Sequence, residues 1–177
     1  MGSLIMRLIH ASHDLKIAAA LEKPGHPAIG RDAGEIAGIG RIGVPVGTFS
    51  EKTLKSCSVI VDFSHPESTM EFLEGAKRKK IPLVIGTTGM SDAQKKRIKD
   101  ASKIIPIVMS PNMSLGVNLM FKIVGDTSRA LKDGYDIEIV EAHHRMKKDA
   151  PSGTALRLAE SVASALKRDL NKDAVYQ

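Results

Sequence analysis

Cysteine and aromatic residues are both scarce in this sequence. The single cysteine, Cys57, has no partner for a disulfide and cannot build a cysteine-ligated metal site. Cys57 precedes the apolar run at residues 58–63, so we expect it to be a small residue in or near the core. Aromatic residues make up 3% of the chain, which leaves little surface for stacking nucleic-acid bases. These shortages exclude a disulfide-stapled scaffold and disfavour a nucleic-acid partner.

Long apolar runs are also lacking. No run approaches the length needed to span a bilayer, and the N-terminus lacks the charged segment, apolar stretch and cleavage site of a signal peptide. We therefore expect a soluble protein in a reducing cytoplasm with no membrane partner. The net charge is +6, but the basic residues are dispersed along helical stretches. That dispersion favours a site for anionic small molecules over a nucleic-acid surface.

Short apolar segments alternate with helical patterns in the first two thirds of the chain. Strands are expected at residues 17–21, 59–63, 83–85 and 104–109, and amphipathic helices separate the last three. Strands that are apolar throughout and alternate with helices indicate a parallel sheet covered on both faces. The sequence therefore predicts an α/β fold with a doubly wound, Rossmann-like parallel sheet.

The pattern changes near residue 114. A helix with one apolar face leads from Ser114 to residues 135–140, which alternate at first as a strand with one solvated face does. A further helix is expected to open at residues 149–154 and to carry its apolar face as far as Leu170. We place a domain boundary at residue 114, with the start of an α+β domain beyond it.

The stretch from residue 24 to residue 47 is rich in Gly and Pro and is expected to be a long surface connection. Within it, residues 38–43 match the G-x-G-x-x-G pattern of dinucleotide-binding loops. That pattern carries its meaning only between a strand and the helix that it opens. Here residues 44–47 follow, and their proline and β-branched residues cannot begin a phosphate-capping helix. We interpret the match as a loop without that role.

Glu22 stands at the end of the first expected strand. A dinucleotide fold places an acidic ribose ligand about 20 residues after its glycine turn. Counting back puts the turn and its strand at and before Met1, and Met1-Gly2 then looks like the tail of a Gly-rich turn. The alternative is that Glu22 is a solvated strand end.

Two loops follow expected strands directly. Gly86-Thr87-Thr88-Gly89 follows the strand at residues 83–85, and Ser110-Pro111-Asn112-Met113 follows the strand at residues 104–109. Open parallel sheets bind ligands at the carboxyl ends of their strands, so together the loops fit the nicotinamide side of a dinucleotide cleft. A plain strand-to-helix turn is the alternative for the first loop.

Three residues with acid–base chemistry follow the last expected strand. His143 and His144 leave the sheet at its carboxyl edge, and Lys147 lies in an irregular stretch. An imidazole that gives a proton near neutral pH and an ammonium group suit the reduction of an electron-poor carbon–nitrogen ring. The hydride must come from a cofactor, because no side chain delivers one. The alternatives are ordinary strand-end histidines and a solvated Lys147-Lys148 pair.

Gly153 and Thr154 lie at the start of the last helix, after Asp149 and Ser152 as candidate caps. Free N–H groups at that position, helped by the helix dipole, form an anion site. A carboxylate is the expected ligand, which makes an anionic substrate the natural partner of the two histidines and Lys147.

Residues 141–155, which read EAHHRMKKDAPSGTA, closely resemble the active-site signature of the dihydrodipicolinate reductases. These enzymes, also called 4-hydroxy-tetrahydrodipicolinate reductases, act in the diaminopimelate and lysine pathway. Residues 61–64, 84–89 and 112–118 are similar to further segments of that family and follow the same order. The resemblance covers essentially the whole chain.

The resemblance implies reduction of 4-hydroxy-tetrahydrodipicolinate to tetrahydrodipicolinate with NADH or NADPH. His143 would be the general acid, and Lys147 would protonate or polarise the substrate nitrogen. His144, Gly153 and Thr154 would hold a carboxylate of the cyclic dicarboxylate substrate. The family also forms a homotetramer at full length.

The resemblance further implies a dinucleotide-binding domain at residues 1–114 and a partial substrate-binding, catalytic domain at residues 115–177. Glu22 and Lys23 would sit at the adenosine ribose. The rest of the cofactor site would be lined by Gly86, Thr87, Thr88, Ser110, Pro111, Asn112 and Met113.

The chain also departs from that family. The resemblance implies that the family's first strand and most of the family's Gly-rich loop would precede Met1. It also implies that the rest of the family's substrate-domain sheet would follow Gln177. A non-catalytic or inactive dinucleotide-binding fragment is therefore the alternative, although it would not need His143 and Lys147 together. A semialdehyde-type dehydrogenase would need a nucleophilic cysteine in the cleft, and Cys57 lies before a strand instead.

Overall fold

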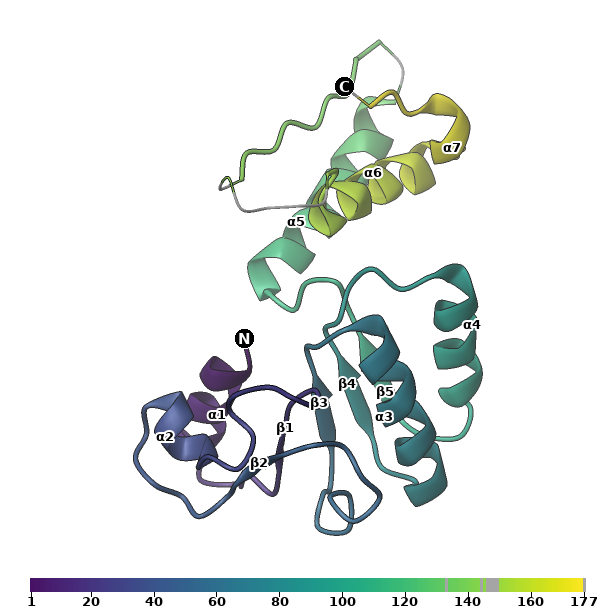
Figure 1. The fold of residues 1–177 in the computed structure, drawn as a ribbon. Coiled ribbons are helices and arrows are strands. Elements are labelled where there is room, and N and C mark those ends of the chain that lie inside the picture. The colour runs from purple at the N-terminus through teal and green to yellow at the C-terminus, as the bar shows by residue number, and fades with distance from the viewer. Residues whose placement is uncertain (133, 144, 146–149, 177) are drawn as a thin grey trace. The chain divides into compact units, whose positions relative to one another are not determined.

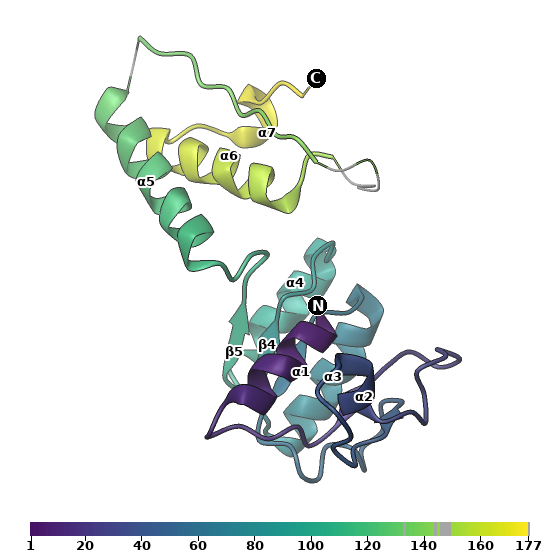
Figure 2. The same ribbon diagram turned by 90° about the vertical axis from the view of Figure 1, so that its left-hand side faces the viewer.

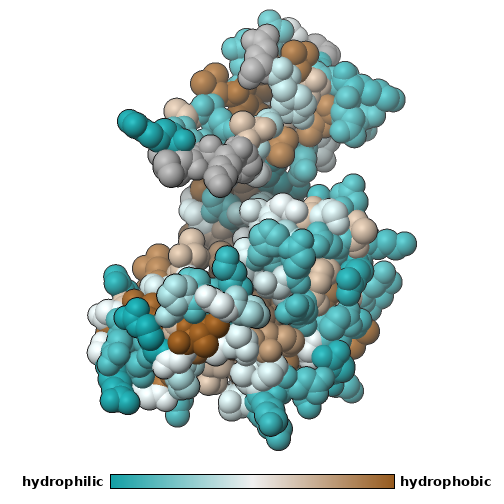
Figure 3. Space-filling view, in the orientation of Figure 1, coloured by the Kyte–Doolittle hydropathy of each residue, from teal (hydrophilic) through white to brown (hydrophobic). Residues whose placement is uncertain are grey.

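The chain folds as two compact units, Met1–Met109 and Ser110–Gln177. The structure, a computed structural model, describes residues 1–132, 134–143, 145 and 150–176. None of the described helices is long and apolar enough to cross a membrane. Apolar side chains reach the surface of both units among the polar ones (Figure 3).

The first unit alternates helices and strands (Figure 1). Its elements are α1 (Gly2–Ala11), β1 (Ala20–Leu21), α2 (Ala33–Ala37), β2 (Val46–Gly47), β3 (Ile60–Asp62), α3 (Pro66–Lys79), β4 (Leu83–Ile85), α4 (Asp92–Ala101) and β5 (Ile107–Met109). Strand β1 pairs with β2, β3 with β4 and β4 with β5, and all three pairs are parallel. The predicted Rossmann-like α/β fold is confirmed.

The parallel strands form two sheets, β1-β2 and β3-β4-β5. Among the described residues no strand pairs with both β1 and β3, so each keeps an edge without a neighbour. An open groove of about 270 Å³ lies beside β1 and is lined by residues such as Ala18, Leu21 and Lys52. The expected strand at residues 17–21 is correspondingly short, because ladder hydrogen bonds form only at its last two residues.

The main core lies on one face of β3-β4-β5, against α3 and α4. Alternate strand residues point into it, so Ile60, Leu83 and Ile85 are buried. On the other face, Val61 is 41% exposed and Val108 is 59% exposed. Among the described residues, α3 and α4 both pack on the first of these faces.

Helix α1 lies beside α2 (Figure 2) and buries none of its own residues. It begins at Gly2 and ends at Ala11. Helix α4 begins with a capping box: Gln94 N–H donates to Ser91 Oγ at 3.3 Å, and Ser91 N–H donates to Gln94 Oε1 at 2.8 Å.

Cys57 packs against the main core, as expected for a small near-core residue. Its thiol donates to the carbonyl oxygen of Thr53 at 3.2 Å. Burial raises the pKa of this thiol, which keeps it in the less reactive protonated form.

The stretch from residue 24 to residue 47 is not the plain connection that the sequence predicts, since it contains α2 and β2. The carboxylate of Asp32 organises it by accepting backbone N–H groups of Gly34 at 2.8 Å, Glu35 at 3.2 Å, Ile42 at 3.1 Å and Gly43 at 2.7 Å. Desolvation alone would raise the pKa of Asp32, but these hydrogen bonds outweigh it and hold the pKa below its ordinary value. This stabilisation is lost as the pH falls through the lowered pKa.

The G-x-G-x-x-G match follows α2 and precedes β2, which is the reverse of a dinucleotide-binding turn. Gly38 ends α2 in the left-handed conformation, with φ of 74°. Two of the amides beyond it, those of Ile42 and Gly43, already donate to Asp32. The interpretation of residues 38–43 as a loop without a phosphate role agrees with this structure.

The second unit contains α5 (Leu115–Leu131), α6 (Gly153–Leu166) and α7 (Leu170–Asp173), and α5 packs against α6. The strand predicted at residues 135–140 is absent. That segment is extended but unpaired, and Val140 is 91% exposed, because no described strand lies beside it to complete a ladder. The last helix is also shorter than predicted, since Lys167 adopts the left-handed conformation with φ of 58° and Leu170 belongs to α7.

A close backbone contact in the first unit gives a direct test of the fold. A Cβ atom at Gly34 would lie 2.2 Å from the carbonyl oxygen of Gly40. Alanine usually stabilises a helix relative to glycine by about 1 kcal/mol, but here the backbone would have to move. We expect Gly34→Ala to lower the free energy of unfolding by about 1–3 kcal/mol in urea titrations.

Gly2→Ala is the matched control, because a Cβ at Gly2 in α1 has nothing within 4 Å. Its stability should be unchanged or slightly increased. Equal destabilisation by the two variants would contradict the tight contact at Gly34.

Candidate functional site

The loop after β4 is tied to the segment after β3 by a buried carboxylate. Asp62 ends β3 and is 2% exposed. Its Oδ1 accepts the Ser64 hydroxyl at 2.5 Å, and its Oδ2 accepts the hydroxyls of Thr87 at 3.1 Å and of Thr69. The Ser64 N–H donates to Thr87 Oγ1 at 2.9 Å, and the Gly86 N–H donates to the Asp62 carbonyl oxygen at 2.8 Å.

The two threonines of this loop differ in orientation. Thr87 is 4% exposed and its hydroxyl is engaged by Asp62 and Ser64, whereas Thr88 is exposed. A Cβ at Gly86 would lie 2.1 Å from the ring of Phe63, so the absence of a side chain there has an internal reason. What the loop offers a ligand is therefore its backbone and Thr88.

Glu22 and Lys23 follow β1 and are both exposed. The Glu22 N–H continues the ladder by donating to the Gly47 carbonyl oxygen at 2.9 Å. Its side chain accepts only a local bond, from the Lys23 N–H at 3.2 Å. The carboxylate of Glu22 thus lies at the carboxyl end of β1, as the sequence predicts.

In the second unit, residues 110–113 form a turn that leads into α5. The Ser110 hydroxyl donates to the Asn112 carbonyl oxygen at 2.6 Å, and Asn112 Oδ1 accepts the Ser114 N–H at 2.9 Å. A Cβ at Gly153 would lie 3.9 Å from Cβ of Pro111. The structure therefore brings the predicted cofactor turn at residues 110–113 close to the predicted substrate residue Gly153.

Helix α6 begins with a well-defined cap. Ser152 is buried, and its Oγ accepts the Ala155 N–H at 3.1 Å. The N–H groups of Gly153 and Thr154 have no acceptor among the described residues, and both residues are half-buried. Two such amides at a helix N-terminus are the arrangement on which the prediction of an anion site depends, and the anion site itself stays a prediction.

Glu141 is a site residue that the sequence reasoning missed, although it belongs to the quoted signature. Its Oε1 accepts the Ser152 N–H at 2.7 Å, and its Oε2 lies 3.6 Å from Nδ1 of His143. Glu141 therefore links the candidate general acid to the start of α6. The signal was available, because side chains two residues apart on an extended segment project to the same side.

Two predicted site residues, His144 and Lys147, lie outside the described residues. The structure thus brings together His143, Glu141 and the start of α6 within the second unit. In the part of the chain that it describes, no group of three or more His, Cys, Asp or Glu side chains could hold a metal ion.

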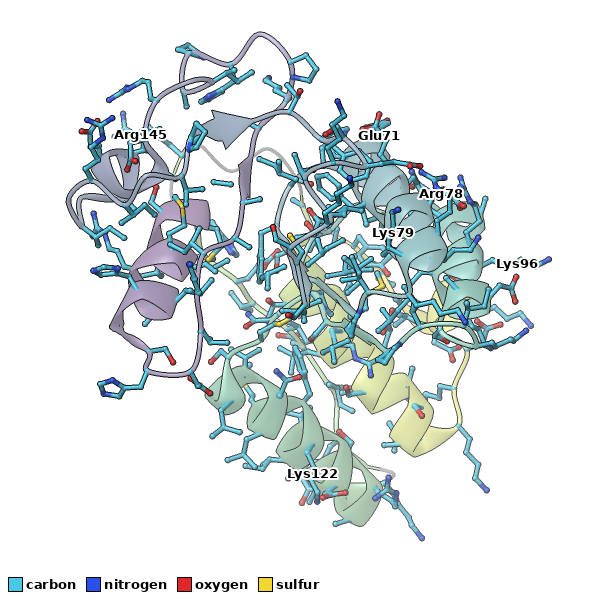
Figure 4. The ribbon with its side chains drawn as sticks, turned by 90° about the horizontal axis from the view of Figure 1, so that it is seen from below. Glu71, Arg78, Lys79, Lys96, Lys122 and Arg145 are labelled. Carbon is cyan, nitrogen blue, oxygen red and sulfur yellow. The ribbon has the colours of Figure 1, made fainter. Side chains whose placement is uncertain are left out.

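The basic side chains do not gather in one place. Arg78 and Lys79 project from α3, Lys96 from α4 and Lys122 from α5 (Figure 4). Arg78 is paired with Glu51 at 2.9 Å, and Lys122 with an aspartate one turn away. Ion pairs of this kind leave the net charge of +6 unchanged but lower the positive potential around the basic side chains that form them.

An open parallel sheet of this Rossmann-like kind binds ligands at the carboxyl ends of its strands, and in the following unit Glu141 links His143 to a helix N-terminus. The family profile described as "Dihydrodipicolinate reductase, N-terminus" matches residues 1–113. The profile described as "Dihydrodipicolinate reductase, C-terminus" matches residues 116–176. The chain belongs to the dihydrodipicolinate reductase family.

The chain is similar to curated proteins named 4-hydroxy-tetrahydrodipicolinate reductase. It is 47% identical to that of Magnetococcus marinus and 46% identical to that of Hahella chejuensis, in each case over 176 residues and 99% of this chain. The aligned region spans 66% of the length of both relatives.

A solved structure of dipicolinate-bound dihydrodipicolinate reductase from Paenisporosarcina sp. TG-14 has the same fold. It superposes with a TM-score of 0.68 at 23% sequence identity, covering 93% of this chain and 61% of that one.

The cap of α6 provides a test within the second unit. Ser152→Ala removes the side-chain acceptor for the Ala155 N–H, so it should lower the free energy of unfolding by about 1 kcal/mol. Ser161→Ala, in the middle of the same helix, removes only a bond back to the Arg157 carbonyl oxygen and should have little effect. Denaturation followed by circular dichroism compares them, and equal losses would argue against a cap at Ser152.

Proposed function

We propose that this chain is the larger part of a reductase that converts 4-hydroxy-tetrahydrodipicolinate to tetrahydrodipicolinate with NADH or NADPH. The observation that carries the proposal is the start of α6, where two free amides adjoin a buried serine cap bonded to Glu141. The family match over both units and the names of the curated relatives support it. The step belongs to diaminopimelate and lysine synthesis, for which we propose a cytoplasmic location.

The substrate residues are assigned from chemistry. The amides of Gly153 and Thr154, with the Thr154 hydroxyl and His144, hold a carboxylate of the cyclic dicarboxylate. His143 acts as the general acid, and Glu141 keeps its ring oriented through Nδ1. Lys147 provides positive charge at the substrate nitrogen, where it stabilises charge that develops in the transition state.

The cofactor residues lie in both units. Glu22 and Lys23 serve the adenosine ribose, and the backbone of residues 86–88 with the turn at residues 110–113 lines the remainder. When bound, the reduced nicotinamide supplies the hydride. The Thr87 side chain contributes indirectly, because its hydroxyl is engaged inside the protein.

The alternative function is a dinucleotide-binding fragment without turnover. It is favoured by the division of the strands into two sheets and by the unpaired segment at residues 135–140. Both features weaken the scaffold that fixes catalytic geometry, and small displacements cost about 100-fold in rate. We propose that the full-length protein is a homotetramer whose assembly supplies the missing support.

The reductase and the fragment without turnover can be distinguished by comparing the NADH affinity and reductase activity of this chain with those of a longer protein. We expect a protein extended to the full length of the curated relatives to bind NADH much more tightly than the 177-residue chain and to reduce the substrate. The physical reason is that the cofactor pyrophosphate needs amides of a glycine turn, which the described loops do not provide. NADH titration and a reductase assay on both proteins test this, and equal affinity and kcat would contradict it.

The carboxylate site predicts a separate effect on substrate binding. Thr154→Val removes one hydroxyl that bonds to a charged group, worth about 1.5–3 kcal/mol, so KM for the dicarboxylate should rise about 10- to 150-fold. The KM for NADH should not change. Lys147→Ala is the contrasting variant, because loss of charge in the transition state lowers kcat instead. An equal rise in both KM values would move Thr154 to the cofactor site.

A further inference from the structure

A carboxylate buried to this degree is unusual unless it is well bonded. Asp62 is 2% exposed, and among the described residues no Lys, Arg or His forms an ion pair with it. Removing such a group from water costs several kcal/mol, which hydrogen bonds must offset. If the end of β3 needed only to pack against its neighbours, an apolar residue would cost less free energy than a buried carboxylate. The hydrogen bonds that Asp62 accepts therefore point to a role beyond packing.

The donors to Asp62 come from three different segments. Ser64 lies in the turn after β3, Thr69 in the first turns of α3, and Thr87 in the loop after β4. A carboxylate accepts several hydroxyls at once, whereas an asparagine amide would direct its NH₂ group at one of them. The acidic residue is thus required by the arrangement of its donors.

The network closes on the loop after β4. Thr87 Oγ1 donates to Asp62 and at the same time accepts the Ser64 N–H at 2.9 Å. The Phe63 ring covers Gly86 from the same segment, and the Gly86 N–H is bonded to the Asp62 carbonyl oxygen. Every residue from Asp62 to Ser64 therefore contacts Gly86 or Thr87.

These hydrogen bonds determine which side chains of the loop at residues 86–89 face the protein interior and which face solvent. With Thr87 held inward, Thr88 is exposed and Gly89 follows with φ of 77°. A loop that is already ordered loses less conformational entropy when a ligand binds, and this raises affinity without a new contact.

We infer that Asp62 is a positioning residue for dinucleotide binding: it holds Thr87 inward so that the backbone of residues 86–88 and the Thr88 side chain are presented to the cofactor. The inference rests on the proposed function, since it assigns the loop after β4 to the cofactor. Asp62 itself touches no ligand. Its effect on the reaction passes through Thr87.

Two buried threonines bonded to the same carboxylate give a matched pair of variants. Thr87→Val removes the loop hydroxyl that donates to Asp62 and accepts the Ser64 N–H, whereas Thr69→Val removes an α3 hydroxyl that donates to Asp62 and to the His65 carbonyl oxygen. Both lose one buried hydroxyl, so both should lower the thermal unfolding temperature. Thr87→Ser keeps a hydroxyl and should restore the wild-type behaviour.

The first measurement needs no cofactor. The Gly86 N–H is bonded to the Asp62 carbonyl oxygen, so its hydrogen exchange in the 177-residue chain should become at least about tenfold faster in Thr87→Val and return to the wild-type rate in Thr87→Ser. In Thr69→Val the exchange of this loop should stay unchanged. Similar exchange in all variants would overturn the role of Asp62 in ordering the loop.

The second measurement is the Kd for NADH in the longer chain described above, with the substrate KM measured beside it. Thr87→Val should raise Kd about tenfold and leave the substrate KM unchanged, and Thr69→Val should change neither. Equal values of Kd in Thr87→Val and Thr69→Val would reduce Asp62 to a purely structural residue. If the exchange result holds but wild-type protein neither binds NADH nor turns over, the proposed function fails and the assignment of the loop to the cofactor falls with it.

Discussion

Packing of one face of β3-β4-β5 against α3 and α4 is the interaction on which the first unit depends. It buries Leu83 and Ile85 from the central strand and holds the three strands in register. Because Asp62 is the register partner of Ile85, the end of β3 stands directly beside the residue that precedes Gly86. The polar network at the strand ends is therefore a consequence of the apolar packing beneath it, and the orientation of the loop after β4 follows from both.

The second unit is organised differently, since two helices take the place of a sheet. Helices α5 and α6 pack closely enough that a Cβ at Gly125 would lie 3.6 Å from the Ser161 carbonyl oxygen. This contact lies in the middle of α6, and at the start of that helix Ser152 caps it while Glu141 accepts the Ser152 N–H. The extended segment that carries His143 thus gains its attachment to α6 through side-chain bonds, because it has no strand partner.

Local signals in the sequence predicted the parts of the fold that local interactions determine. Helices α3 and α4 were expected between apolar runs of the sequence, and β4 follows from one of those runs. Residues 135–140 were predicted to be a strand because polar and apolar residues alternate there. A strand also needs a neighbouring strand for its backbone hydrogen bonds, and the local sequence does not reveal whether one is present. Helix α2 was missed since Asp32 stabilises it partly through amides ten residues further along. For the site, position in the loop predicted Gly86 and Thr87, but the inward direction of Thr87 depends on Asp62, which is 25 residues away in the sequence. The assignments of His143 and Lys147 as catalytic residues, of His144, Gly153 and Thr154 as substrate residues, and of the cofactor residues all stay predictions.

The uncovered face of β3-β4-β5 has a thermodynamic consequence. Unfolding raises the heat capacity mainly because apolar surface becomes exposed to water. In this protein Val61 and Val108 are already partly hydrated in the native state, with 41% and 59% of their surface exposed. The increment in heat capacity per residue is therefore smaller than in a sheet covered on both faces, and the curve of stability against temperature is broader and flatter.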